Sequence, residues 1–191
     1  VLALSSHHII SDGPSMGVVL HEIIQNYATL KKGLALVAKP VLQYRDFLQW
    51  QTNLETDAAT KAHEAYWLNQ FSTPVTDLTL PYDFPRPQVK TYQGARAWAR
   101  IDPTLLKAVR ELAGKNSSTL YMVLFAAFSV LMHRLSEQKR IAIGAPYTGR
   151  SMSGSESLVG YCVHLLPIVS VFSPSDTFAA HLQTIKQQLL Q

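Results

Sequence analysis

Apolar residues recur every three to four positions along much of the chain, and short apolar runs separate these stretches. The three-to-four-residue spacing is typical of amphipathic helices, and the short runs are typical of buried strands. The pattern predicts helices over residues 14–31, 42–51, 57–71, 120–132 and 176–190, with a short helix after Pro103. It predicts strands over residues 1–6, 94–102, 140–145 and 158–172. The alternation of helices and strands indicates a mixed α/β (α+β) chain.

A proline-rich stretch interrupts this regular pattern. Each proline fixes its own φ and restricts the residue before it, which disfavours both helices and strands. The four prolines concerned are Pro74, Pro81, Pro85 and Pro87. We therefore expect residues 81–93 to form a linker between a first part, residues 1–80, and a second part, residues 94–191.

Two histidines, an acid and a glycine lie together between the first predicted strand and the first predicted helix. They are His7, His8, Asp12 and Gly13, and Pro14 then opens the helix without losing a needed hydrogen bond. Imidazole has an unperturbed pKa of about 6.5, so a histidine here can accept and return a proton near neutral pH. Consecutive residues that leave a strand point to opposite sides, so we expect one histidine to face a cleft and the other to be buried. Asp12 can orient an imidazole or hold the turn through an arginine, and Gly13 can approach a ligand with its backbone. The alternative is that the polar residues are ordinary members of a loop.

Composition limits the classes of partner and compartment. With 191 residues, 47% of them hydrophobic, the chain can bury a core. Its net charge of +4 comes from scattered cations rather than a basic run, which favours a mildly basic solvated surface over a nucleic-acid site. A single cysteine, Cys162, cannot form an internal disulfide, and the longest apolar run of about 13 residues is shorter than the roughly 20 of a membrane span. We expect no nucleic acid or membrane partner and a cytoplasmic location.

Several motifs in order along the chain resemble those of the condensation domains of nonribosomal peptide synthetases. The His-His-x-x-x-Asp-Gly pattern of residues 7–13 is similar to the family signature, and residues 44–51 resemble its Tyr-x-Asp-Phe-x-x-Trp-Gln element. Residues 144–150 resemble its glycine-and-arginine loop. Residues 160–164 resemble its Gly-x-Phe-Val-Asn element, with His164 where asparagine is common.

The resemblance implies a two-subdomain fold of the chloramphenicol-acetyltransferase type, of which this chain holds only part. Residues 1–80 would end the amino-terminal subdomain, and residues 94–191 would begin the carboxy-terminal one. It also implies peptide-bond formation in secondary metabolite biosynthesis, between a donor acyl or peptidyl thioester and an acceptor aminoacyl thioester. Both substrates would be carried on 4′-phosphopantetheine by an upstream donor and a downstream acceptor carrier domain, with an adenylation domain nearby and no cofactor or metal bound by the domain itself. We expect the 191 residues alone to expose apolar surface and to be inactive.

The resemblance also assigns roles to individual residues. His8 would be the catalytic residue that faces the substrates, either as a general base or as a group that positions the amine. His7 would be its structural partner, and Gly13 would bring its backbone close to the thioester. Asp12 would pair with an arginine, which we expect largely in the amino-terminal part of the domain that precedes these residues. His164 would be a substrate contact or, equally, a packed strand histidine.

The same sequence features also bear on alternative functions. A related acyltransferase could use the same histidine with free coenzyme A or carrier-bound donors, and a noncatalytic module could dock carriers. An epimerisation domain shares the histidine motif, but its accompanying pattern is not seen in this sequence, and a cyclisation domain is disfavoured because it would replace the histidines with aspartates. A metal site on His8 and Asp12, with His7 or His21, has a spacing that matches no common zinc pattern.

Overall fold

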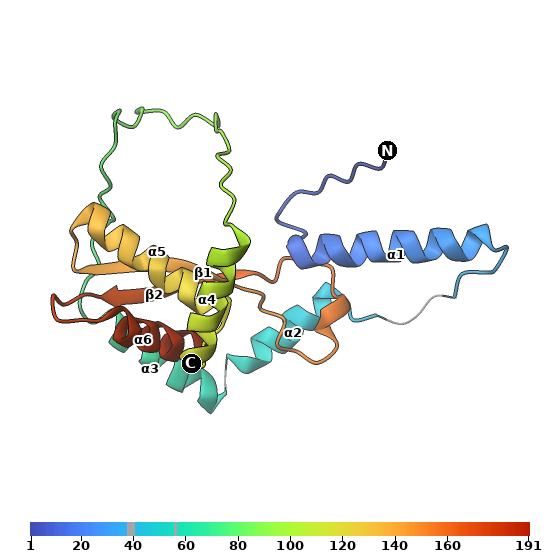
Figure 1. The fold of residues 1–191 in the computed structure, drawn as a ribbon. Coiled ribbons are helices and arrows are strands. Elements are labelled where there is room, and N and C mark those ends of the chain that lie inside the picture. The colour runs from blue at the N-terminus through green and yellow to red at the C-terminus, as the bar shows by residue number, and fades with distance from the viewer. Residues whose placement is uncertain (38–40, 56) are drawn as a thin grey trace. The chain divides into compact units, whose positions relative to one another are not determined.

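The computed structural model describes residues 1–37, 41–55 and 57–191 (Figure 1). The helices are α1 (Gly13–Lys31), α2 (Tyr44–Leu54), α3 (Ala58–Gln70), α4 (Pro103–Lys115), α5 (Leu120–Ser136) and α6 (Phe178–Leu190). The strands β1 (Arg140–Tyr147) and β2 (His164–Val171) pair in a two-stranded sheet, and a short 3₁₀ helix spans Ser155–Ser157. All five predicted helix regions and the short helix after Pro103 are therefore present.

The chain folds as two compact units. One unit comprises Val1–Ser72 and Ala145–Leu166, and the other comprises Thr73–Gly144 and Pro167–Gln191. Each unit is thus built from two separate stretches of chain. The subdomain boundaries expected from the proline-rich linker stay a prediction.

Polar side chains determine where the helices begin. Asp12 caps α1, Asp102 caps α4 and Thr119 caps α5, in each case by accepting a hydrogen bond from a backbone N–H of the first turn. Pro14 and Pro103 stand in the first turns of α1 and α4, where a proline loses no intrahelical hydrogen bond. These signals are local, which is why the helix starts at Pro14 and Pro103 could be predicted.

Two of the predicted strands do not form. Residues 1–6 and 94–102 have no regular structure and are exposed, so the prediction of a buried strand before the histidines is wrong. A strand needs a neighbouring strand for its backbone hydrogen bonds, and among the described residues neither stretch has one. The strand predicted over residues 140–145 is confirmed as β1, and the one predicted over residues 158–172 forms only as β2. Residues 72–93, between α3 and α4, have no helix or strand, as their prolines predict (Figure 1).

The unit that contains α4, α5 and α6 has its core around α5. This helix packs against both α4 and α6, as expected for a segment that is apolar around most of its circumference. Buried apolar side chains lie on α5, α6 and β2, and these include Val123, Ala126, Ile168, Leu182 and Ile185. Other apolar side chains of α5 and most of those of α1 are exposed, in line with the expected exposure of apolar surface.

The core of the other unit surrounds α2. Phe47 is buried with Leu158 and Cys162, and Tyr44 and Trp50 pack against this cluster from the same helix. The motif residues Tyr44 and Trp50 are therefore packing residues of this unit.

No single helix in the described residues has both the length and the apolar character to cross a membrane. Within the part of the chain that the structure describes, α4 and α5 taken together reach the required length and composition, but the chain bends by 102° between them.

Candidate active site

The carboxylate of Asp12 joins the start of α1 to two segments that lie 138 and 150 positions away in the sequence. Its Oδ1 caps the helix by accepting from the backbone N–H of Ser15 at 3.0 Å. Arg150 donates from Nη2 to Oδ1 at 2.7 Å and from Nη1 to Oδ2 at 2.8 Å, which makes a bidentate ion pair. The backbone N–H of Cys162 donates to Oδ2 at 3.0 Å. One buried carboxylate thus ties together α1, the loop after β1 and the segment before β2.

This arrangement corrects one expectation. The arginine that pairs with Asp12 is Arg150, which belongs to the same unit of this chain, and not a residue of the part expected to precede it. The sequence identified a glycine-and-arginine loop over residues 144–150 but contained no local sign that this loop meets the histidine turn.

The ionisation of Asp12 follows from its partners. Burial by itself raises the pKa of the carboxyl, but the hydrogen bonds from Arg150, Ser15 and the Cys162 backbone favour the charged form more strongly. The net result is a pKa well below the ordinary value for aspartate. The Asp12 hydrogen bond and charge raise the pKa of Arg150 against the opposing effect of burial. Asp12 is therefore a fixed anion at neutral pH and not a proton carrier.

Ser15 completes this network and was missed by the sequence reasoning. It is fully buried, and its Oγ lies 2.6 Å from Oδ1 of Asp12 and 2.9 Å from the carbonyl oxygen of Gly160. Its Oγ also accepts from the Gly160 N–H and from Nη2 of Arg150, both at 3.0 Å. The available signal was the Asp-x-x-Ser spacing at a helix start, which places the two side chains next to each other.

Two glycines allow the backbone to approach closely within this network. Gly149 has φ +66°, which favours glycine, and an added Cβ would lie 1.9 Å from the carbonyl oxygen of Cys162. An added Cβ on Gly160 would lie 2.2 Å from Cδ2 of Tyr44, whose ring covers this residue. Tyr44 also donates from Oη to the carbonyl oxygen of Tyr161 at 2.8 Å.

The two histidines occupy different surroundings. His8 lines a hollow of about 360 Å³ together with Asp12, Gly13 and Met16, and its ring meets the ring of Tyr161 edge to face at a centroid distance of 5.4 Å. His7 is exposed, and its Nδ1 accepts from the backbone N–H of Ile9 at 3.1 Å. The expectation that one histidine is buried inward is wrong, because the chain before it forms no strand and no described segment covers it. The two histidines therefore differ because His8 lines the hollow and His7 does not, and not because they point to opposite faces of a strand.

Gly13 is the first residue of α1 and borders the same hollow as His8. An added Cβ at this position would meet nothing within 4 Å. Its backbone is therefore accessible from the hollow, as the role expected for Gly13 requires.

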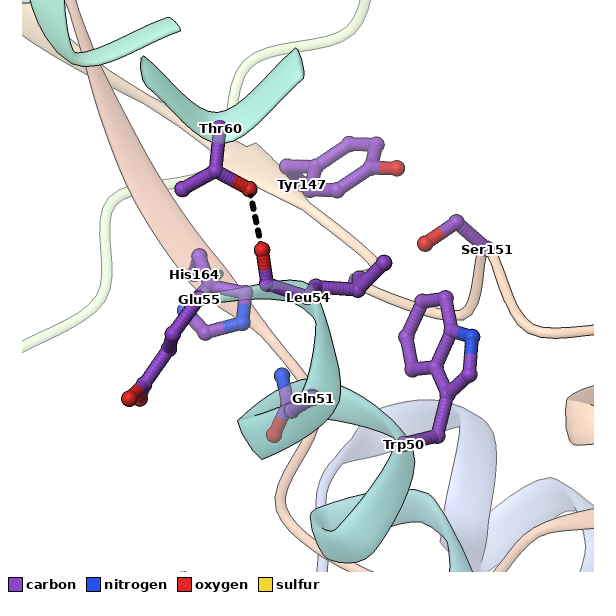
Figure 2. A pocket seen from close by; sticks show the side chains of 9 residues that line it. Trp50, Gln51, Leu54, Glu55, Thr60, Tyr147, Ser151 and His164 are labelled. Carbon is purple, nitrogen blue, oxygen red and sulfur yellow. Dashed lines mark hydrogen bonds between the residues drawn. The ribbon is translucent and has the colours of Figure 1, made fainter. Parts of the chain in front are cut away.

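His164 lies at the start of β2 and borders a second hollow of about 450 Å³ (Figure 2). Trp50 and Leu54 of α2, Tyr147 of β1 and Ser151 also line this hollow. The hydroxyl of Thr60 donates to the carbonyl oxygen of Leu54 at 2.6 Å, which links α3 to the end of α2 beside it (Figure 2). His164 is exposed, so a ligand in this hollow can reach its imidazole.

In the part of the chain that the structure describes, no three His, Cys, Asp or Glu side chains gather closely enough to hold a metal ion.

Comparison with known proteins identifies the family. The model of the Condensation domain family matches residues 1–191. Tyrocidine synthase 3 of Brevibacillus parabrevis is 38% identical over 188 residues, and bacitracin synthase 2 of Bacillus licheniformis is 34% identical over 191 residues. These matches cover 98% and 100% of this chain but only 3% and 7% of the two synthases. The chain is thus similar to a small part of each much longer relative.

Solved structures support the same conclusion about the fold. The condensation domain of the monacolin K polyketide synthase MokA is 26% identical, with a TM-score of 0.77 over 96% of this chain and 43% of that one. The complex of the X-domain and OxyB from teicoplanin biosynthesis gives a TM-score of 0.83 at 20% identity, again over 96% of this chain and 42% of that one. The predicted fold class, a chloramphenicol-acetyltransferase-like α/β fold present in part, is confirmed. Because the family model matches residues 1–191 of this chain and the His-His-x-x-x-Asp-Gly turn is assembled around Asp12, this chain belongs to the condensation domain family of the nonribosomal peptide synthetases.

Proposed function

We propose that the protein containing this chain forms an amide bond between two carrier-bound substrates. The amine of the acceptor aminoacyl group attacks the carbonyl carbon of the donor thioester. The new C–N bond forms, the C–S bond breaks, and the proton lost by the amine is taken up by the departing thiolate. The observation that carries this proposal is the histidine turn, in which His8 borders a hollow beside a buried Asp12–Arg150 ion pair.

His8 is the residue that we propose to act on the substrates. An α-amino group has a pKa near 8 and is partly neutral at pH 7, so the reaction does not require a strong base. His8 therefore acts either as a general base or by hydrogen-bonding the amine and the tetrahedral intermediate.

The neighbouring residues support this role by holding the turn. His7 fixes the local conformation of the turn, because its Nδ1 accepts a hydrogen bond from the backbone N–H of Ile9. Asp12 anchors the turn through Arg150, and Gly13 presents accessible backbone to the thioester. The imidazole of His164 contacts a substrate from the second hollow.

The partners proposed for this domain are those of an assembly line. Donor and acceptor peptidyl carrier domains deliver the thioesters on 4′-phosphopantetheine, an adenylation domain belongs to the same synthetase, and the domain itself binds no cofactor. The synthetase works in the cytoplasm. Residues 1–80 and 94–191 contribute to the two subdomains, and residues 81–93 link them.

The test measures condensation by the full-length synthetase with both carriers loaded. His8→Ala should lower the rate by about 100-fold or more while the protein remains folded, because it removes the group that acts on the amine. Asp12→Ala should lower both rate and stability. His63→Ala, which changes an exposed histidine on α3, is the matched control and should leave the rate unchanged. Wild-type rate in the His8 variant would refute the proposed role.

The same assay separates the two alternatives. Turnover of free coenzyme A thioesters at a rate similar to that of loaded carriers would favour a related acyltransferase. Carrier binding without turnover by the wild-type protein would favour a noncatalytic docking module.

A further inference from the structure

The ring of Tyr161 is held against the imidazole of His8 by a rigid piece of backbone. The two rings meet at an interplanar angle of 74° with their centroids 5.4 Å apart. An edge-to-face arrangement at this distance is favourable for two aromatic rings. Apart from the residues of its own turn and helix, His8 thus has a contact from a segment that is distant in the sequence.

Backbone hydrogen bonds fix the three residues around Tyr161. The N–H and carbonyl of Gly160 both lie within hydrogen-bond distance of Oγ of Ser15. The carbonyl of Tyr161 accepts from Oη of Tyr44, and the N–H of Cys162 donates to Oδ2 of Asp12. The backbone at Tyr161 is therefore fixed on both sides, although the residue as a whole is 44% exposed.

We propose that Tyr161 is a positioning residue for His8, held in place by the backbone contacts of residues 160–162 with the Asp12 network. This inference rests on the proposed function, because it assumes that His8 acts on the substrates. The turn that carries His8 is exposed, so its imidazole would otherwise sample several rotamers. The Tyr161 ring restricts this freedom and keeps the imidazole directed at the hollow. The ring rather than the hydroxyl makes the contact, so phenylalanine should replace tyrosine.

The Asp12–Arg150 ion pair also helps to hold Tyr161 in place. The pair holds not only the start of α1 but also the backbone that carries Tyr161, since Asp12 bonds the Cys162 N–H directly. A substitution that breaks the Asp12–Arg150 ion pair should therefore affect His8 both through the start of α1 and through the backbone that carries Tyr161.

The experiment compares Tyr161→Leu with Tyr161→Phe in the full-length synthetase and uses two measurements. The first is the steady-state rate of condensation with loaded carriers. The second is the rate at which diethyl pyrocarbonate modifies His8, followed by peptide mass spectrometry, with the exposed His63 as internal reference. Modification reports the accessibility of the imidazole and does not depend on turnover.

The leucine variant should lower kcat by about 3- to 10-fold with little change in KM, because the contact orients His8 and does not bind substrate. The same variant should increase the rate of His8 modification relative to His63. Tyr161→Phe should restore both values to those of the wild-type protein. Tyr121→Leu is the matched control, since Tyr121 is 46% exposed and also meets an aromatic ring, that of Phe125.

The proposal requires both changes in the leucine variant and their recovery in the phenylalanine variant. A change in kcat without faster modification, faster modification without a change in kcat, or equal loss in Tyr161→Phe would each overturn it. Failure of the wild-type protein to condense loaded substrates refutes the proposed function instead, and this is seen before any variant is compared.

Discussion

Replacement of Arg150 by methionine tests the ion pair at the centre of the site. Methionine fills similar space but cannot donate, so the change removes both hydrogen bonds to Asp12, at 2.7 and 2.8 Å, together with those to Ser15 and the Leu158 carbonyl. The side chains of Arg150 and Asp12 are 7% and 0% exposed, so water does not replace the lost donors. Removal of one partner from such a buried pair costs about 3 to 5 kcal/mol, because it leaves an uncompensated charge. We therefore expect the free energy of unfolding at pH 7 to fall by about this amount.

The effect of pH supplies an independent check. The pKa of Asp12 is lowered in the folded wild-type protein, so its contribution to stability is complete above the unfolded value of about 3.9. This contribution is lost as the pH falls through the folded value. In Arg150→Met the main group that lowers the pKa of Asp12 is gone while burial still raises it, so the folded variant takes up a proton at higher pH. The stability difference between the variant and the wild-type protein should consequently shrink as the pH is lowered from 7 towards 4.

Urea denaturation followed by tryptophan fluorescence measures both quantities, since Trp50 packs in the same unit. Lys107→Met is the matched control. It breaks an ion pair with Glu111 whose side chains are 80% and 57% exposed, and such a pair contributes less than about 1 kcal/mol. A loss below about 1 kcal/mol in Arg150→Met, or a loss that does not change with pH, would contradict the structural role assigned to Arg150.

Two further predictions concern packing and ionisation. Gly160→Ala should reduce the free energy of unfolding by about 1 to 3 kcal/mol, because the new Cβ meets the Tyr44 ring. Gly17→Ala, which meets nothing within 4 Å in α1, should leave stability equal or higher in the same urea titration. Burial lowers the pKa of His181, whose Nε2 lies 2.7 Å from Oγ of Ser129, so the wild-type protein should lose stability as the pH falls below about 6.5. His181→Phe should lose less stability between pH 7 and 5, and an unchanged pH dependence would exclude His181 as the source.

The helices and their starts could be predicted because the signals are local. The Asp12-x-Pro14 start of α1 and the apolar periodicity of α5 lie within a few residues of the structure that they specify. Strand predictions depended on a partner and failed where none of the described residues supplies one, as at residues 94–102. The same limit applies to His7, whose predicted burial depended on a strand that does not form.

Within the site, the sequence by itself determined the histidine turn and the identity of its polar residues. His8, Asp12 and Gly13 lie within six consecutive positions, so their proximity needs no tertiary contact. Only the tertiary structure decided that Arg150 is the partner of Asp12, that Ser15 joins the two to Gly160, and that Tyr161 meets His8. These contacts join positions 135 or more residues apart, and short-range patterns carry no information about which distant segments meet. They form because burial of a charged carboxylate is costly unless it is paired and hydrogen-bonded, and in the folded chain Arg150 and the Cys162 backbone N–H donate to Asp12.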